Sequence, residues 1–268
     1  TVTATDPEGD SFSFSISGSE LSITSEGVLS FTSAPDYETK ATYTATVTAV
    51  DTEDNSATQD ITVNVTNIND NSPAFTSNTT FSAEENQTSI GTVTVADADG
   101  DDIGFTVSGD ELEISSSGDL TFITAPDYEA KITYTATVTA SDGANSVTQN
   151  ITVNVINVND VAPEFTSEAT FSADENQTAI GTVTATDVDS DDVAFTVSGS
   201  ELTITTNGIL TFTDAPDYET KTTYTATVTA SDGTNSSTQE IVVNIINLND
   251  NGPSFTSITT FSIEENQT

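Results

Sequence analysis

Apolar and polar residues alternate in many short stretches of this chain. In the segment 133–140, Tyr134, Ala136, Val138 and Ala140 alternate with threonines, and a period of two is typical of a half-buried β-strand. Clusters of Gly, Asp and Ser separate such stretches and indicate turns. The pattern predicts seven strands in about 90 residues and no helix. Besides 133–140, the expected strands cover 91–96, 105–108, 112–114, 120–123 and 151–155, with one more around Phe81.

The same pattern repeats along the chain. The tripeptide that begins at Phe75 recurs at Phe165 and at Phe255, a step of 90 residues each time. Such a period indicates one small domain per repeat. We therefore expect four segments: a repeat without its first strand at 1–74, whole repeats at 75–164 and 165–254, and the first strand of a further repeat at 255–268.

Seven short strands per repeat predict an all-β fold. We expect tandem seven-stranded Greek-key β-sandwiches of the immunoglobulin-like type, joined into an extended rod. The alternating apolar positions would form the core of each sandwich. In the second repeat these positions are Leu120, Phe122, Tyr134, Val138, Ile151 and Val153.

Charge narrows the range of partners. The chain has 43 acidic and 3 basic residues and a formal net charge of −40, which excludes nucleic acid, because phosphate binding needs Lys and Arg. No segment approaches the ~18–20 apolar residues that span a bilayer, so we expect no membrane insertion. Self-repulsion at this charge implies bound cations or concentrated salt. A solvated acidic surface suited to a saline habitat is the alternative explanation for part of the charge.

Catalysis fits the composition poorly. The chain contains neither His nor Cys, and no Ser has a recognisable base that would activate it as a nucleophile. Paired carboxylates could mimic a glycosidase dyad, but a metal site already explains them. We therefore expect that the chain is not an enzyme.

Four acidic motifs recur in fixed order in each repeat, and an Asn-rich segment closes it. In the second repeat these are Glu84-Glu85-Asn86, Asp97-Ala98-Asp99, Asp127-Tyr128-Glu129, Asp142 and Asn157-Val158-Asn159-Asp160. Two carboxylates spaced by two at a strand end point to the same side. Ca²⁺ takes about six to eight oxygens from carboxylates, amides and backbone carbonyls. The motifs therefore predict Ca²⁺ sites, and an EF-hand is excluded because Ser108 stands where its bidentate Glu would be.

These motifs resemble the cadherin repeat, whose marks are an acidic E-N near the first strand, a D-x-D after the second, an L-D-R-E and a closing D-x-N-D-N-x-P. The E-N-Q-T-x-I-G-T-V-T-A-T-D opening and the A-P-D-Y-E motif look most like the bacterial variety. The resemblance covers the whole chain. It implies an extracellular or cell-surface location and about three Ca²⁺ ions per linker, in a setting where such modules bind at about 10⁻⁴–10⁻³ M.

Carried over motif by motif, the resemblance implies three groups of metal ligands. The first linker would use Asp36, Glu38, Asn69, Asp70, Asn71, Asp97, Asp99 and Asp142. The second linker would use Glu85, Asp127, Glu129, Asn159, Asp160, Asp187, Asp189 and Asp232. The corresponding ligands at the end of the third repeat are Glu175, Asp217, Glu219, Asn249, Asp250 and Asn251.

Two departures from the family pattern bear on these sites. Val161 stands where the final Asn of the closing motif would be, so only its backbone carbonyl is a candidate ligand. Asn67, Asn157 and Asn247 replace the usual leading Asp, which lowers the charge of each site.

The predicted function is mechanical. Carboxylates crowded at a linker repel one another until Ca²⁺ bridges both repeats, so bound ions would stiffen a linker that otherwise bends. We interpret the chain as a calcium-stiffened extracellular repeat array, a shaft or spacer of a surface adhesin or fibre, with any cell-surface or matrix ligand bound outside this window. The strand-swapped adhesion of vertebrate cadherins depends on a Trp, and this chain has none.

The alternative is the subunit of an extracellular filament. The chain lacks the opening strand of its first repeat and carries a surplus strand at 255–268. The last strand of one copy would complete the first repeat of the next copy by donor-strand addition. The expected partners are therefore other copies of the same repeat or chain.

Overall fold

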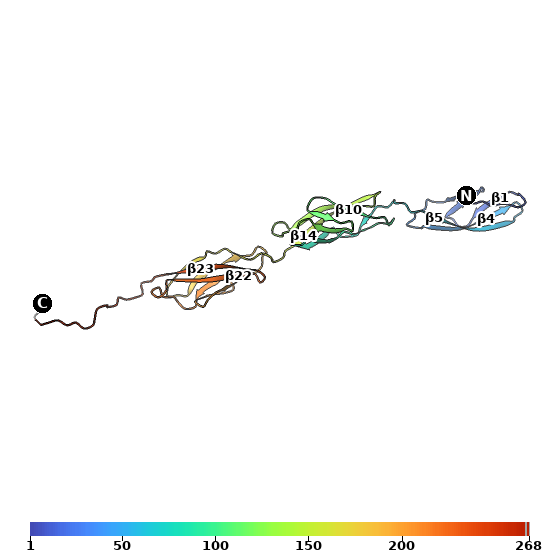
Figure 1. Cartoon of the computed structure of the whole chain (residues 1–268). Helices are drawn as coiled ribbons and strands as arrows, with labels where there is room; N and C mark the ends of the chain where they lie inside the picture. Colours follow the sequence, from blue (N-terminus) through green and yellow to red (C-terminus); the bar gives the residue numbers. More distant parts are fainter. Residues whose placement is uncertain (266, 268) are drawn as a thin grey trace. The chain divides into compact units, whose positions relative to one another are not determined.

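The computed structural model describes residues 1–265 and 267, and the described chain contains strands but no helix. It consists of two compact units, Thr1–Ile156 and Asn157–Thr268, and each is described by itself. Figure 1 shows the strands of both units by sequence colour. Nothing in the described part of the chain is a helix that could cross a membrane. The prediction of an all-β sandwich fold is confirmed.

The first repeat, in the first unit, has two small sheets. One has the order β1-β4-β5, and the other pairs β2 with β3. These strands are β1 (Phe12–Ile16), β2 (Leu21–Ile23), β3 (Leu29–Phe31), β4 (Thr42–Asp51) and β5 (Ser56–Asn64). Within the residues described, β5 is an edge strand.

The second repeat, in the same unit, has a fuller set of strands. These are β6 (Ala74–Phe75), β7 (Thr80–Glu84), β8 (Ser89–Thr92), β9 (Val95–Ala96), β10 (Gly104–Val107), β11 (Leu112–Ile114), β12 (Asp119–Phe122), β13 (Thr133–Ser141) and β14 (Ser146–Ile156). The larger sheet has the order β10-β13-β14-β7, with β7 parallel to β14. The smaller sheets are β11-β12-β8 and β6-β9.

The single strand expected at 91–96 is divided between two sheets. β8 pairs with β12, whereas β9 pairs with β6. Between the two strands, Val93 is buried in the core. The prediction of one continuous strand was wrong here, because alternation along the chain does not show which sheet a residue joins.

The third repeat, in the second unit, has the same arrangement. Its strands are β15 (Glu164–Phe165), β16 (Thr170–Asp174), β17 (Ala179–Thr182), β18 (Ala185–Thr186), β19 (Ala194–Val197), β20 (Leu202–Ile204), β21 (Ile209–Phe212), β22 (Thr223–Ser231) and β23 (Ser236–Ile246). The sheets have the orders β16-β23-β22-β19, β17-β21-β20 and β15-β18, and β16 runs parallel to β23.

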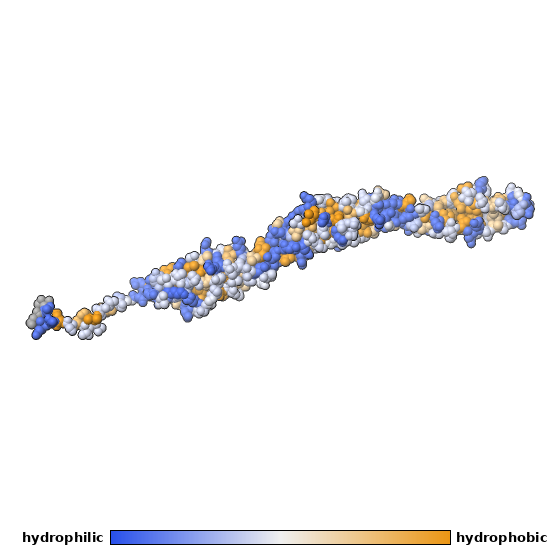
Figure 2. Space-filling model, viewed as in Figure 1, coloured by the Kyte–Doolittle hydropathy of each residue, from blue (hydrophilic) through white to orange (hydrophobic). Residues whose placement is uncertain are grey.

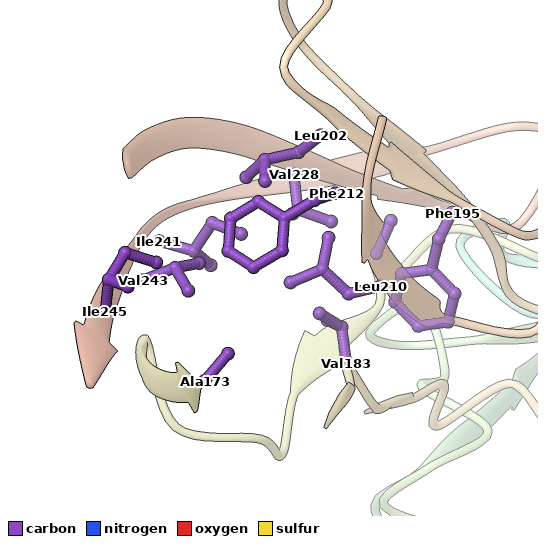
Figure 3. Close-up of a cluster of buried hydrophobic side chains, with 11 residues drawn as sticks. Ala173, Val183, Phe195, Leu202, Leu210, Phe212, Val228, Ile241, Val243 and Ile245 are labelled. Atoms are coloured by element: carbon purple, nitrogen blue, oxygen red, sulfur yellow. The ribbon is translucent and has the colours of Figure 1, made fainter. Parts of the chain in front are cut away.

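The predicted core positions are confirmed, apart from one ring that lies at its edge. In the second repeat, Leu120, Phe122, Ile151, Val138 and Val153 are all buried. Tyr134 is half-buried and packs edge-on against Phe122, with 4.9 Å between ring centroids. Figure 3 shows the matching core of the third repeat, with aliphatic side chains around the ring of Phe212. Each fully buried Leu, Val or Phe contributes about 1.5–3 kcal/mol to folding.

The turn before β12 requires glycine. Gly118 has φ of +88°, and a Cβ there would lie 2.2 Å from the carbonyl oxygen of Val93. The two residues are also hydrogen-bonded, because the N–H of Val93 donates to the carbonyl oxygen of Gly118. Gly27 and Gly208 meet the same kind of backbone contact in the other repeats. Each repeat therefore needs glycine at this turn, because a side chain there would collide with the neighbouring backbone.

The segment that follows the third repeat contrasts with the packed sandwiches. No strand forms between residues 255 and 265, and Phe255, Ile258, Phe261 and Ile263 are largely exposed. Figure 2 shows orange, hydrophobic patches on this C-terminal segment, whereas much of the remaining surface is white or blue. Asn266 and Thr268, which belong to the strand expected at 255–268, lie outside the described residues.

Candidate metal centre

The linker that follows β5 is fixed to two loops of the second repeat. The side-chain amides of Asn67 and Asn71 donate to the carbonyl oxygen and to Oδ1 of Asp99, at 2.8 and 2.9 Å. The backbone N–H groups of Asp70 and Asn71 both donate to Asp99 Oδ2, at 3.1 and 2.8 Å. Asn69 Nδ2 donates to the carbonyl oxygen of Asp142. Asp99 is therefore the main attachment point of the linker.

Three carboxylates converge at this linker. Ligand oxygens of Glu38, Asp70 and Asp99 lie within 4.8 Å of one another. Glu38 belongs to the turn after β3 in the first repeat, and Asp99 to the loop after β9 in the second. All three basic side chains of the sequence pair with glutamates elsewhere. No lysine therefore pairs with a carboxylate of the cluster, and like charges this close repel strongly.

The protonation tendencies of the cluster reflect this crowding. Partial burial, followed by the hydrogen bond and the charge of Asp99, raises the pKa of Glu38 above its usual value. Partial burial, followed by the charges of Asp97 and Asp99, raises the pKa of Asp101. The hydrogen bond from the Asn71 side chain lowers the pKa of Asp99. A cation bound among these oxygens would offset the repulsion between the carboxylates.

Buried oxygen atoms test whether the residues fit a cation. Among the described residues, eight buried side-chain atoms have no hydrogen-bond partner, and six of them belong to the two linkers and the loops that meet them. These six are Asn67 Oδ1, Asp97 Oδ2, Asn157 Oδ1, Asp187 Oδ2, Asp189 Oδ1 and Asp232 Oδ2. Leaving such an acceptor unsatisfied costs about 1–3 kcal/mol. Because all six are hard oxygen atoms, the donor set fits Ca²⁺.

The second unit begins with a linker of the same design. Asn157 Nδ2 donates to the carbonyl oxygen of Asp189 at 2.8 Å, and the N–H groups of Asp160 and Val161 donate to Asp189 Oδ2 at 3.1 and 2.9 Å. Ligand oxygens of Asp187, Asp189 and Asp191 lie within 4.8 Å of one another. Asp189 is only 5% exposed. The predicted residues Asn159 and Asp232 lie on either side of Asn235, which bonds to both.

The glutamate of the E-N motif is buried in both whole repeats. Glu85 accepts from the N–H of Tyr128, and Glu175 accepts from the N–H of Tyr218, at 2.7 and 2.8 Å. Each glutamate therefore orients the D-Y-E turn of its own repeat. In the third repeat, ligand oxygens of Glu175, Asp217 and Glu219 form a cluster within 4.8 Å.

The predicted ligands that follow the third repeat extend this cluster. Asn251 Nδ2 donates to Glu219 at 2.9 Å, and Asp250 accepts from the side chains of Asn176 and Asn251. Asn249 is exposed beside them. Carboxylate and amide oxygens therefore gather after the third repeat, and their ligation of a metal stays a prediction.

Two predicted ligands have a different local role. Asp36 accepts from Glu38 N, Thr39 N and the Thr39 hydroxyl, and so caps its own turn. Asp142 Oδ1 accepts from the N–H groups of Ala144 and Asn145. Both carboxylates shape the turns beside the cluster, and their direct ligation stays a prediction.

The sequence interpretation did not identify the asparagine that locks each linker in place. Asn145 Nδ2 donates to Asn69 Oδ1 at 2.9 Å and to the Asn71 carbonyl at 3.3 Å. In the third repeat, Asn235 Nδ2 donates to Oδ1 and to the carbonyl oxygen of Asn159, at 3.0 and 3.4 Å. Its signal in the sequence is the D-G-x-N motif, whose Asn follows the predicted Asp by three positions. Asp101 and Asp191, which extend the acidic clusters, were also not among the predicted ligands.

Comparisons with known proteins place these features in a family. The family described as "Bacterial Ig domain" matches residues 159–245. Human Protocadherin gamma-A2 is 35% identical over 243 residues, which cover 79% of this chain and 26% of that protein. The human Desmocollin-1 ectodomain matches with a TM-score of 0.68 at 20% identity, over 94% of this chain and 58% of that chain. Three repeats of mouse Cadherin-23 (EC22-24) match with a TM-score of 0.63 at 22% identity, over 92% and 90%.

The fold and the linker sites define a tandem β-sandwich repeat protein with oxygen-rich clusters at its linkers. These matches support the resemblance of the chain to the cadherin-repeat family. The chain spans about a quarter of the first curated relatives that it matches. The prediction of an extracellular or cell-surface location is confirmed by these relatives. They are cadherins, which fits the expectation of a protein that is not an enzyme.

Proposed function

We propose that this chain is a calcium-stiffened shaft or spacer within an extracellular adhesive repeat array. The observation that carries the proposal is the first linker, where Glu38 of one repeat, Asp70 of the linker and Asp99 of the next repeat converge. Three carboxylates without a paired lysine favour a divalent ion. An ion held there bridges two sandwiches that only a short linker otherwise joins.

The donor set supports Ca²⁺ over other metals. The cluster offers carboxylate, amide and carbonyl oxygens only, because the chain contains neither His nor Cys. Zn²⁺ prefers nitrogen and sulfur ligands, and Mg²⁺ keeps several waters in a strict octahedron. Ca²⁺ accepts many oxygen ligands in flexible geometry. The Asn and Asp residues around Asp99 would supply such oxygens. The resemblance to cadherins also supports Ca²⁺ as the ion at the junctions between repeats.

Several finer points belong to the same proposal. By sequence, the second linker would work as the first does, with about three ions at each linker in the family pattern. The match to a bacterial Ig domain over 159–245 supports the bacterial variety of repeat. Other copies of the chain are the expected partners, and a cell-surface or matrix ligand would bind outside this window.

Calcium titration with a matched control tests the proposal. We expect calorimetry on the metal-free chain to show binding at about 10⁻⁴–10⁻³ M. Asp99→Asn should remove the part of the heat that comes from the first linker. Glu113→Gln, which removes an equal charge from an exposed position in the middle of β11, should change little. Equal effects of the two substitutions would show that the chain attracts Ca²⁺ only through its net charge.

Limited proteolysis tests the mechanical part. With Ca²⁺, the linker 66–73 should resist cleavage, and EDTA should expose it while the sandwich strands stay intact. Electron microscopy should show straight particles in Ca²⁺ and bent particles in EDTA. Particles that remain straight and protease-resistant in EDTA would contradict calcium stiffening.

A second candidate function is that of a filament subunit, which rests on the likeness between segments 75–88 and 255–268. β14 and β12 of the second repeat each have an extra strand beside them, β7 and β8. Their counterparts β5 and β3 have no such partner among the described residues. In sequence, the segment 255–268 differs from 75–88, which contains β7, only at Ile258 and Ile263. A segment of this sequence from a second copy would pair with β5 as β7 pairs with β14.

A synthetic peptide distinguishes this candidate from an array in which all repeats belong to one continuous chain. The peptide 255–268 should bind the first repeat and raise its melting temperature. The same peptide with Phe261→Asp and Ile263→Asp should not. A chain that stays monomeric at high concentration and ignores the peptide would rule out assembly by donor strands.

A further inference from the structure

The three basic residues of the chain occupy one position in each repeat. Lys40, Lys131 and Lys221 each come four residues after the first Asp of the D-Y-E turn. Each pairs with a glutamate 20 residues earlier, at 2.6 Å in the first repeat and 2.5 Å in the other two. Against 43 acidic residues, the three cations all stand beside the turn that carries a predicted Ca²⁺ ligand.

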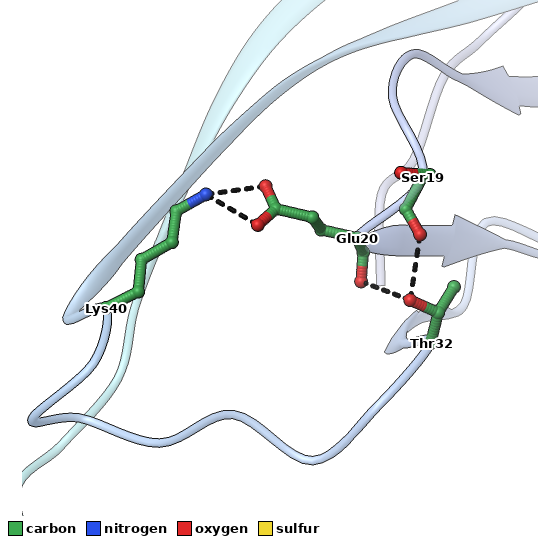
Figure 4. Close-up of polar contacts among 4 residues, drawn as sticks. All are labelled: Ser19, Glu20, Thr32 and Lys40. Atoms are coloured by element: carbon green, nitrogen blue, oxygen red, sulfur yellow. Dashed lines mark hydrogen bonds and ion pairs between the residues drawn. The ribbon is translucent and has the colours of Figure 1, made fainter.

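The lysine is held from two directions. Lys40 Nζ bonds to both carboxylate oxygens of Glu20, at 2.7 and 2.6 Å, as Figure 4 shows. It also lies 4.5 Å from the centre of the Tyr43 ring on β4. The other two lysines lie 4.2 Å from the rings of Tyr134 and Tyr224. The lysine thus connects the D-Y-E turn to the residue just before one strand and to a tyrosine on another strand of its own repeat.

Both ends of the loop that carries the ligand are attached to the same residue. At the start of the loop, Thr32 donates through its hydroxyl and its N–H to the carbonyl oxygen of Glu20, both at 3.0 Å (Figure 4). At its end, Lys40 reaches the Glu20 carboxylate. Lys40 N also donates to the Asp36 carbonyl oxygen and closes the turn that presents Glu38. Without the ion pair, the loop would keep only its first attachment to Glu20.

The attachment recurs in the other repeats. Thr213 donates to the carbonyl oxygen of Glu201 through its N–H, and Lys221 reaches the Glu201 carboxylate. In the second repeat, the N–H of Ile123 donates to the carbonyl oxygen of Glu111, and Lys131 pairs with the Glu111 carboxylate. The arrangement therefore belongs to the repeat rather than to one loop.

Stability alone is a weak reason for this arrangement. The side chains of Lys40 and Glu20 are 40% and 53% exposed, and exposed ion pairs contribute about 0–1 kcal/mol. A cation over an exposed ring adds about 0.5–1 kcal/mol. Coulomb's law is also unfavourable for a metal site, because a positive charge near Glu38 repels Ca²⁺.

We propose that Lys40, Lys131 and Lys221 are positioning residues, which hold the D-Y-E turn in its ligating shape before Ca²⁺ binds. The inference rests on the proposed function and adds a requirement to it. Glutamate, lysine and tyrosine together form an anchor that needs no metal, and the metal then meets a preorganised turn. Such preorganisation of ligands by their neighbours raises metal affinity.

The sign of one substitution separates positioning from electrostatics. Lys40→Gln removes a positive charge beside the first linker, so electrostatics alone predicts tighter Ca²⁺ binding. Positioning predicts weaker binding, by about tenfold, the lower end of the losses seen when a residue behind a metal ligand is removed. The NMR signal of the Asn71 amide, which bonds to Asp99, reports Ca²⁺ at this linker alone.

Two further variants make the test complete. The double variant Glu20→Gln with Lys40→Gln leaves the net charge unchanged, so it should weaken Ca²⁺ as much as Lys40→Gln if the anchor matters. Lys40→Arg keeps the ion pair and the ring contact and should restore near-normal affinity. Melting in EDTA should change little in all three variants.

Each outcome has a clear meaning. Unchanged or tighter Ca²⁺ binding in Lys40→Gln and in the double variant would overturn the inference while leaving the proposed function intact. An Asn71 signal that ignores Ca²⁺ in the unaltered chain would overturn the proposed function, and the inference with it. If Lys40→Gln unfolds in EDTA, the anchor is needed for folding and the positioning role is rejected.

Discussion

The two linkers differ at one position that decides how their central aspartate is satisfied. In the first linker, Asn71 donates to Asp99 with both its backbone N–H and its side-chain amide, at 2.8 and 2.9 Å. In the second, Val161 donates to Asp189 only with its backbone N–H, at 2.9 Å. The second carboxylate oxygen of Asp189 is then buried without a partner.

The difference shows that one side chain can replace part of what a cation supplies. Asn71 satisfies Asp99 Oδ1 from within the protein, so an ion that binds there competes with an amide. At Asp189 the corresponding oxygen has no such competitor and carries the cost of burial, about 1–3 kcal/mol, until a ligand reaches it. We therefore expect the second linker to depend on Ca²⁺ more than the first.

The comparison of the two linkers assumes that the cores of the repeats fold without metal. Core substitutions test this assumption, and they should have the largest effect. Phe122→Ala and Phe212→Ala should each lower the free energy of unfolding by about 3–5 kcal/mol, because they leave cavities in tightly packed cores. Chemical denaturation should give the same loss in Ca²⁺ and in EDTA. A chain that is already unfolded in EDTA would show that ions hold the repeats themselves together.

Removing the central aspartates should separate the two linkers most directly. In EDTA, Asp99→Ala should destabilise the chain by about 1–3 kcal/mol, because it strands the donors of Asn71 and Asp70. Asp189→Ala should cost less, because it also removes a buried oxygen without a partner. In Ca²⁺, each variant should bind at least about tenfold more weakly at its own linker, a change of about 1.4 kcal/mol.

Denaturation in both buffers, with NMR signals of residues 71 and 161 as local reporters, would measure these effects. Glu113→Gln serves as the charge-matched control. Equal losses for Asp99→Ala and Asp189→Ala in EDTA would remove the distinction between the linkers.

Exchanging the two linker residues should give the smallest but most specific effect. Val161→Asn should add a donor for Asp189 Oδ1 and stabilise the metal-free chain by about 0.5–1.5 kcal/mol. Asn71→Val should destabilise it by a similar amount. Thermal melting in EDTA measures both, and the differences should shrink in Ca²⁺, because the ion then satisfies the same oxygen. A gain from Val161→Asn that persists unchanged in saturating Ca²⁺ would argue against this competition.

Local patterns predicted the parts of the fold that depend on neighbours in sequence. Alternation identified β13 and the core positions Leu120 and Val153, because the side chains of a strand alternate between its two faces. The same reasoning could not find that 91–96 divides between two sheets, since pairing partners lie far along the chain. The leading asparagines show a similar limit. From the sequence, the only predicted effect of Asn67 was a lower charge of the metal site. In the structure its side-chain amide donates to the carbonyl oxygen of Asp99, and the carboxylate of an Asp could not donate this hydrogen bond.

By itself, the sequence determined the period, the sandwich cores and the residue types that gather at each linker, because all three follow from spacing along the chain. Tertiary structure decided which oxygens the protein satisfies and which it leaves for a cation. Asn71 and Asp99 are 28 residues apart, and Asn145 lies 76 residues from Asn69. Hydrogen bonding depends on distance and direction in space, so only the folded linker shows that Oδ1 of Asp99 accepts from a side-chain amide and Oδ1 of Asp189 does not.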